Sequence, residues 1–142
     1  MRKIPLLVLV ALLAAAAGAQ AISFGFGDPI FETSLNEIGA SAKLDMAGFT
    51  AEISLQWGLP AVKVQATLSQ GLAPAEVYLA AGLAAISGKS IEIVVETYKK
   101  NKAKGWGAIA KDLGIKPGSK EFKALKDKAG AAAEKIKNKK KG

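Results

Sequence analysis

The chain of 142 residues contains neither cysteine nor histidine. Without these side chains it cannot build a disulfide framework, a zinc site of the cysteine or histidine type, or a Ser–His or Cys–His nucleophilic pair. It also lacks a glycine-rich phosphate loop of the GxGxxG or Walker type. These absences argue against most enzyme classes. We therefore predict a protein that is not an enzyme, with no catalytic residue, cofactor or metal ion.

Arginine and aromatic residues are also scarce. The only arginine is Arg2, and aromatic residues make up 6% of the chain, although half of all residues are hydrophobic. Alanine and leucine at high density favour closely packed helices. Lysine is a hydrated point charge, whereas arginine is the usual side chain for reading bases or phosphates in a bidentate manner. An all-lysine surface therefore predicts non-specific attraction to anions, or serves solubility alone.

The charge is unevenly distributed along the chain. Residues 22–98 contain three lysines and eight acidic residues, a net charge of −5, whereas residues 99–142 contain fifteen lysines and four acidic residues, a net charge of +11. The chain thus combines an acidic body with a basic C-terminal third.

Residues 1–21 have the pattern of a cleavable signal peptide. Arg2 and Lys3 precede an apolar run from Ile4 to Ala19, and Ala19-Gln20-Ala21 is a small-x-small cleavage site. A transmembrane helix needs about 20 apolar residues, and this run is shorter. An uncleaved membrane anchor is therefore the less favoured alternative. We predict cleavage after Ala21, with Ala19 as the second choice, and a periplasmic or secreted location.

Glycine and proline divide the remainder into short helical segments. We predict an irregular N-terminal arm at 22–29, a helical domain at 30–128 and a flexible lysine- and alanine-rich tail at 129–142. The fold class is all-α, a compact bundle of about six to seven short helices. Residues 61–68 have the valine and threonine content of a strand, but their neighbours favour a helix. The expected helices begin near residue 30 and then cover about 45–57, 60–69, 74–86, 90–102, 106–113 and 119–128.

The strongest candidate for a binding site is a stretch in which lysines alternate with aromatic residues, a pattern that can hold an anionic polymer through charge and stacking. Its members are Tyr98, Lys99, Lys100, Lys102, Lys104 and Trp106. The alternative is that Trp106 belongs to a buried face with Ile109 and Leu113, and that Tyr98 points towards the core.

Two further patterns invite a functional interpretation. Glu92 and Glu96 lie four residues apart and could form a catalytic carboxylate pair, but an exposed acidic face with a Glu96–Lys100 ion pair is the simpler interpretation. Residues 109–115 match the first helix and turn of a helix-turn-helix motif. The match then ends, because Phe122 comes two positions late and the following helix has no Arg, Asn or Gln to read bases. We interpret 109–128 as a helix pair with similar packing, and specific nucleic-acid binding as an alternative that the export signal disfavours.

The stretch YKKNKAKGWGAIAKDLGIKPGSKEFKALK, together with the upstream PAEVYLAAGLAAISGK, resembles a set of exported bacterial proteins of unknown function. The resemblance covers residues 57–126. It implies an exported, helical protein and brings no activity or ligand with it.

Our leading hypothesis is an exported, soluble binding or structural protein whose basic third contacts an anionic envelope polymer, anionic lipid headgroups or an acidic protein. Self-association between the acidic body and the basic third of two copies is the other alternative.

Overall fold

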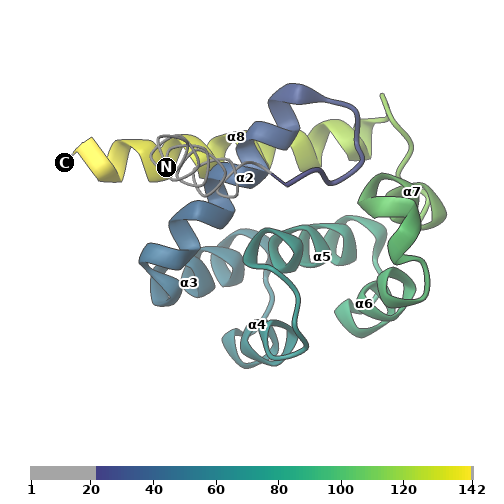
Figure 1. Ribbon diagram of the computed structural model, residues 1–142, viewed down its shortest axis with the longest axis horizontal. Coiled ribbons are helices and arrows are strands. Elements are labelled where there is room, and N and C mark those ends of the chain that lie inside the picture. The colour runs from purple at the N-terminus through teal and green to yellow at the C-terminus, as the bar shows by residue number, and fades with distance from the viewer. Residues whose placement is uncertain (1–21, 142) are drawn as a thin grey trace, which may run out of the picture.

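Seven α-helices and one 3-10 turn make up the residues that this computed structural model describes, 22–141, and no strand occurs among them (Figure 1). The all-α prediction is therefore confirmed. The predicted signal peptide at 1–21 and its cleavage site lie outside the described residues. The elements in chain order are α2 (Pro29–Leu44), α3 (Met46–Trp57), α4 (Ala61–Leu68), α5 (Pro74–Ser87), α6 (Ile91–Lys100), η1 (Lys102–Lys104), α7 (Gly105–Asp112) and α8 (Lys120–Lys141).

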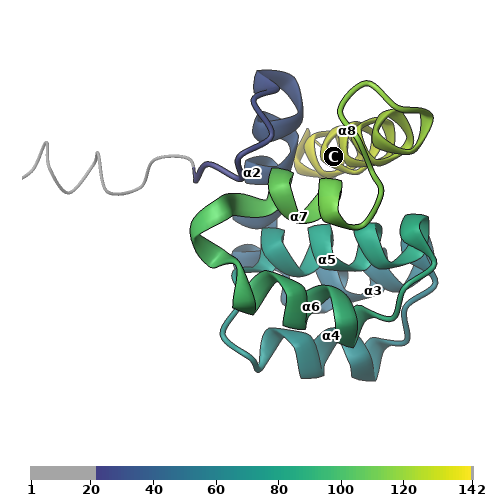
Figure 2. The same cartoon turned by 90° about the vertical axis from the view of Figure 1, so that its right-hand side faces the viewer.

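Helix α5 is the centre of the bundle. Nine of its fourteen residues are buried, and Val77, Leu79 and Leu83 are fully enclosed. It lies between α2 and α8 on one side and α4 and α6 on the other (Figure 2). Gly82 permits the close approach of α8, because a Cβ at this position would lie 2.7 Å from the Leu125 side chain. The alanine-rich sequence of α5 thus serves tight helix packing.

Several helices begin at a residue whose side chain accepts a hydrogen bond from the first turn of the helix. The Asp28 carboxylate accepts a hydrogen bond from the Phe31 backbone N–H at 3.1 Å, and Asp45 accepts one from Gly48 at 2.9 Å. Ser119 does the same for Phe122 at the start of α8. These bonds satisfy N–H groups that have no partner within the helix. The ambiguous segment 61–68 is helix α4.

Helix α8 extends far beyond the predicted end at Lys128. It continues to Lys141, so the described part of the segment 129–142, for which we predicted a flexible tail, is helical. Ala129, Ala132 and Ala133 are at most 4% exposed, and Ile136 packs against the same core. Their spacing of i, i+3, i+4 and i+7 is that of an amphipathic helix. Alanine side chains therefore supply most of the apolar face of this part of α8.

The segment that resembles a helix-turn-helix is not a closely packed helix pair. Helix α7 packs mainly on α6 and η1, whereas α8 packs mainly on α2 (Figure 2). Our prediction of a helix pair at 109–128 is therefore wrong. The long link at 113–119, with Gly114 and Gly118 in the left-handed region, directs the chain away from α7.

Within residues 22–141 no single helix combines the length and the apolar character needed to cross a membrane. The bent pair α5–α6 passes this test of length and composition only when its two helices, which meet at 120°, are joined.

Candidate functional site: a lysine-rich face around helix α7

The two aromatic residues of the candidate site form an internal pair. The Tyr98 and Trp106 rings stack with their centroids 4.1 Å apart, and Trp106 is 2% exposed. The Trp106 indole N–H donates to Glu76 Oε2 at 2.9 Å, and the Tyr98 hydroxyl donates to the same oxygen. Burial, together with the nearby Glu76 carboxylate, raises the pKa of Tyr98 to about 12. This arrangement joins α5, α6 and α7, with the Trp106 ring buried and the Tyr98 ring partly exposed.

The Gly-Trp-Gly motif at 105–107 anchors the N-terminal arm. The backbone N–H groups of Trp106 and Gly107 both donate to the Phe24 carbonyl, at 2.9 and 3.2 Å. A Cβ at Gly107 would lie 2.2 Å from the Gly25 carbonyl oxygen, so only glycine allows the two backbones to come this close. At its other side, the arm is held by Glu32, whose carboxylate accepts hydrogen bonds from two backbone N–H groups of the arm. The irregular arm predicted at 22–29 is thus packed against α7.

The four lysines between the aromatic residues have different surroundings. Lys100 forms an ion pair with Glu96 at 2.8 Å, as expected from the sequence; this contact lowers the pKa of Glu96 and raises that of Lys100. Lys99 donates to the Gln70 side chain at 2.7 Å. Lys102 lies over the Tyr98 ring, 5.9 Å from its centroid, and has no acidic partner in the part of the chain that the structure describes. Lys104 is exposed and also has none.

Three more lysines without acidic partners follow along the chain. Within the described residues, each is exposed and forms no ion pair, unlike Lys126 and several other lysines of α8. Together with Lys102 and Lys104 they form what we call the basic face, which surrounds α7 and the start of α8. Its members are Lys102, Lys104, Lys111, Lys116 and Lys120. The exposed carboxylates in the same stretch are Asp112 and Glu121, so the face keeps a net positive charge.

A hollow of about 320 Å³ lies within the basic face. The N-terminal arm, α7 and the first turn of α8 line it, with Phe26 and Phe122 on one side and Lys104 and Lys111 among its polar groups. Both ammonium groups are without a carboxylate partner, so an anionic group bound here would meet uncompensated positive charge. The sequence pattern identified Lys104 but gave no indication that Lys111 or the arm would join it.

The carboxylates considered for catalysis lie on the exposed side of α6. Glu92 pairs with Lys63 at 3.0 Å, which lowers the pKa of Glu92, and Glu96 pairs with Lys100. Across residues 22–141, no group of three or more acidic side chains comes together in a way that could hold a metal ion.

Sequence reasoning missed Glu76, the acceptor on which the aromatic pair depends. Its other oxygen, Oε1, accepts the Ala73 backbone N–H at 2.9 Å, so the same side chain also closes the first turn of α5. The spacing of three residues from Ala73 is the only sign of this role in the sequence.

No protein-family model, curated protein or solved structure matches this chain.

Proposed function

We propose that this chain is an exported, non-enzymatic binding protein whose basic face holds anionic polymers of the cell envelope. The observation that carries the proposal is a pair of exposed lysines without acidic partners among the described residues, Lys104 and Lys111, which line a hollow, together with the exposed Lys102, Lys116 and Lys120 of the same segment. Lysines elsewhere are often neutralised, for example Lys63 by Glu92 and Lys135 by Glu52. Positive charge that is left unpaired attracts a polyanion, because binding releases the counterions of the polymer.

The type of basic residue supports a polymer over a defined small anion. The basic face consists of lysines alone, and none of them is fixed by a bidentate contact. Lysine provides charge without directional readout, which suits a repeating anionic chain whose groups can exchange places. If the polymer is a nucleic acid, the same argument predicts binding that depends little on its base sequence.

Self-association is less well supported, because the two halves of the chain already satisfy part of their charge within one molecule. Lys126 pairs with Asp28 at 2.8 Å, Lys135 with Glu52 at 3.2 Å and Lys139 with Asp45 at 3.7 Å. Each of these contacts joins the basic helix α8 to the acidic body. The acidic groups that a second copy would use are therefore partly occupied.

The test is a binding titration with fluorescently labelled long-chain polyphosphate, with neutral dextran as the uncharged control. The double variant Lys104→Gln with Lys111→Gln removes the two charges of the hollow. The matched control, Lys43→Gln with Lys89→Gln, removes two exposed charges that form no ion pair among the described residues, one in the last turn of α2 and one in the link between α5 and α6. We expect polyphosphate binding that weakens with salt, and a larger loss in the first variant. Equal losses in both variants, or binding that ignores salt, would contradict the proposal.

A further inference from the structure

A second cavity lies on another face of the molecule, between α3, α8 and the end of α2. Its volume is about 230 Å³, and most of its lining is apolar, including Ile38, Phe49, Ile53 and Ile136. The Tyr78 side chain, which is 1% exposed, also lines it. For comparison, an apolar cavity of about 150 Å³ stays dry and can bind benzene. The cavity is thus large enough for an aliphatic chain of medium length.

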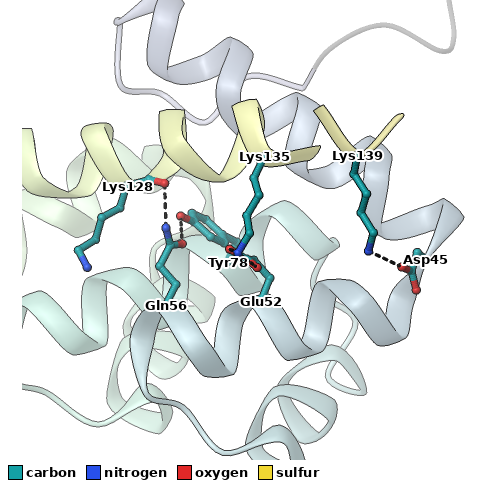
Figure 3. A network of polar contacts seen from close by, with 7 residues as sticks. All are labelled: Asp45, Glu52, Gln56, Tyr78, Lys128, Lys135 and Lys139. Carbon is teal, nitrogen blue, oxygen red and sulfur yellow. Dashed lines mark hydrogen bonds and ion pairs between the residues drawn. The ribbon is translucent and has the colours of Figure 1, made fainter. Parts of the chain in front are cut away.

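Two ion pairs cross the mouth of this cavity. Lys135 and Lys139 extend from α8 towards Glu52 and Asp45 on the opposite side, with nitrogen–oxygen distances of 3.2 and 3.7 Å (Figure 3). The two lysine side chains are 68% and 78% exposed, so these pairs contribute little to stability and can exchange partners. Glu52 is only 27% exposed, so its carboxylate is more enclosed than either lysine side chain.

The cavity has a fixed inner end. Tyr78 donates a hydrogen bond to the Gln56 side-chain oxygen, and the Gln56 amide donates to the Lys128 carbonyl of α8 at 2.9 Å (Figure 3). This relay holds α3, α5 and α8 together at the inner end. Further along α8, the ion pairs among the described residues that span the mouth are those of Lys135 and Lys139.

The charge around the mouth favours an anion over a cation. Residues 134–141 carry five lysines and one glutamate, whereas the acids at the mouth are Asp45 and Glu52. Lys135 and Lys139 balance these two acids, and the other residues of the segment have a net sequence charge of +2, so the net charge of this end of α8 and the mouth is positive. An anionic headgroup would gain from this field, and a cationic one would not.

We propose that this cavity binds a single-chain anionic amphiphile, with its alkyl chain among the apolar residues and its carboxylate or other acidic headgroup at Lys135 and Lys139. The apolar lining supplies most of the affinity through the area removed from water, and the lysines select the headgroup. This site is separate from the basic face and does not depend on polymer binding there.

The experiment is an NMR titration of the purified chain with three ligands that share one alkyl chain, namely octanoate, octanol and octylammonium. We expect octanoate to bind most tightly, with chemical-shift changes at residues that line the cavity. In the double variant Lys135→Gln with Lys139→Gln, octanoate affinity should fall about tenfold, or about 1.4 kcal/mol. Octanol affinity should hardly change. The control Lys63→Gln with Lys123→Gln also removes two exposed lysines from ion pairs, neither of which lines the cavity, and should leave octanoate binding nearly unchanged.

Filling the cavity provides an independent test. Ala132→Leu places bulk in the lining, and Ser41→Leu does so from α2 in case the first variant fails to fold. Either folded variant should lose octanoate binding at least tenfold. Three results would each overturn the proposal: octylammonium binding as tightly as octanoate, lysine variants that bind octanoate as well as the wild type, or unchanged binding in a folded filled variant. The head-group comparison decides the matter if neither filled variant folds.

Discussion

Replacement of Gly107 by alanine should destabilise the protein, although the same change in a helix usually stabilises it. The added Cβ would lie 2.2 Å from the Gly25 carbonyl oxygen, and real Cβ contacts are almost never shorter than 3.0 Å, so the arm must move by about 0.8 Å. That movement strains both hydrogen bonds to the Phe24 carbonyl, each with a contribution of about 0.5–1.5 kcal/mol. Overpacking costs about 1–3 kcal/mol more.

The expected net loss is about 2–4 kcal/mol, because alanine returns up to about 1 kcal/mol of helix propensity. The matched control is Gly130→Ala in α8, where no atom lies within 4 Å of the added Cβ. This variant should gain about 0.5–1 kcal/mol. Urea denaturation followed by circular dichroism measures both values. A Gly107→Ala variant as stable as the wild type would refute the close packing of the arm on α7.

Two further predictions concern the tyrosines and Glu76. Glu76→Gln should lower the free energy of unfolding by about 1–3 kcal/mol, because the glutamine amide has one acceptor oxygen for the three donors that Glu76 accepts from, the Ala73 N–H, the Tyr98 hydroxyl and the Trp106 indole N–H. Urea denaturation measures the loss, and Glu92→Gln on the exposed face of α6 is the control. Burial and Glu76 raise the pKa of Tyr98 to about 12, and burial raises the pKa of Tyr78 above the ordinary tyrosine value of 10.0. A spectrophotometric titration of the folded chain should therefore show little tyrosinate at pH 10.0. The neutral phenols stabilise the fold fully below the tyrosine pKa of the unfolded chain, and this contribution is lost as the pH rises through the tyrosine pKa of the folded chain. An equal amount of tyrosinate at pH 10.0 with and without urea would contradict the raised pKa values.

Local signals in the sequence predicted most of the helices. Asp28-Pro29 and Asp45 are helix starts whose side chains cap the next backbone N–H groups, and Gly58 and Gly88 end helices in the left-handed region. These features depend on residues within one turn of each other, so the order of amino acids is sufficient to reveal them.

The features that the sequence did not predict depend on contacts between distant residues. The role of Gly107 depends on its close approach to Gly25, and the role of Glu76 depends on the two hydrogen-bond donors that α6 and α7 bring to it. Neither contact can be read from the order of residues. The extension of α8 was missed because Ala129 and Ala132 contribute little apolar area each. They form a buried face only where α2 lies close enough to cover them.

The cavity between α3 and α8 was equally invisible in the sequence. It requires the tail segment to be helical, and Lys135 would otherwise belong to a solvated run of charge. The same lysine-rich composition therefore has two roles in the structure. On α8 it closes a cavity through ion pairs, whereas around α7 it remains unpaired.

The salt dependence of polyphosphate binding tests the proposed role of the basic face most directly. For a polyanion, the slope of log affinity against log salt concentration falls by about one for each lysine contact that is removed. Lys104→Gln with Lys111→Gln should therefore reduce the slope by about two, whereas Lys43→Gln with Lys89→Gln should leave it nearly unchanged. Equal slopes in the two double variants would show that total charge, and not the basic face around α7, governs binding.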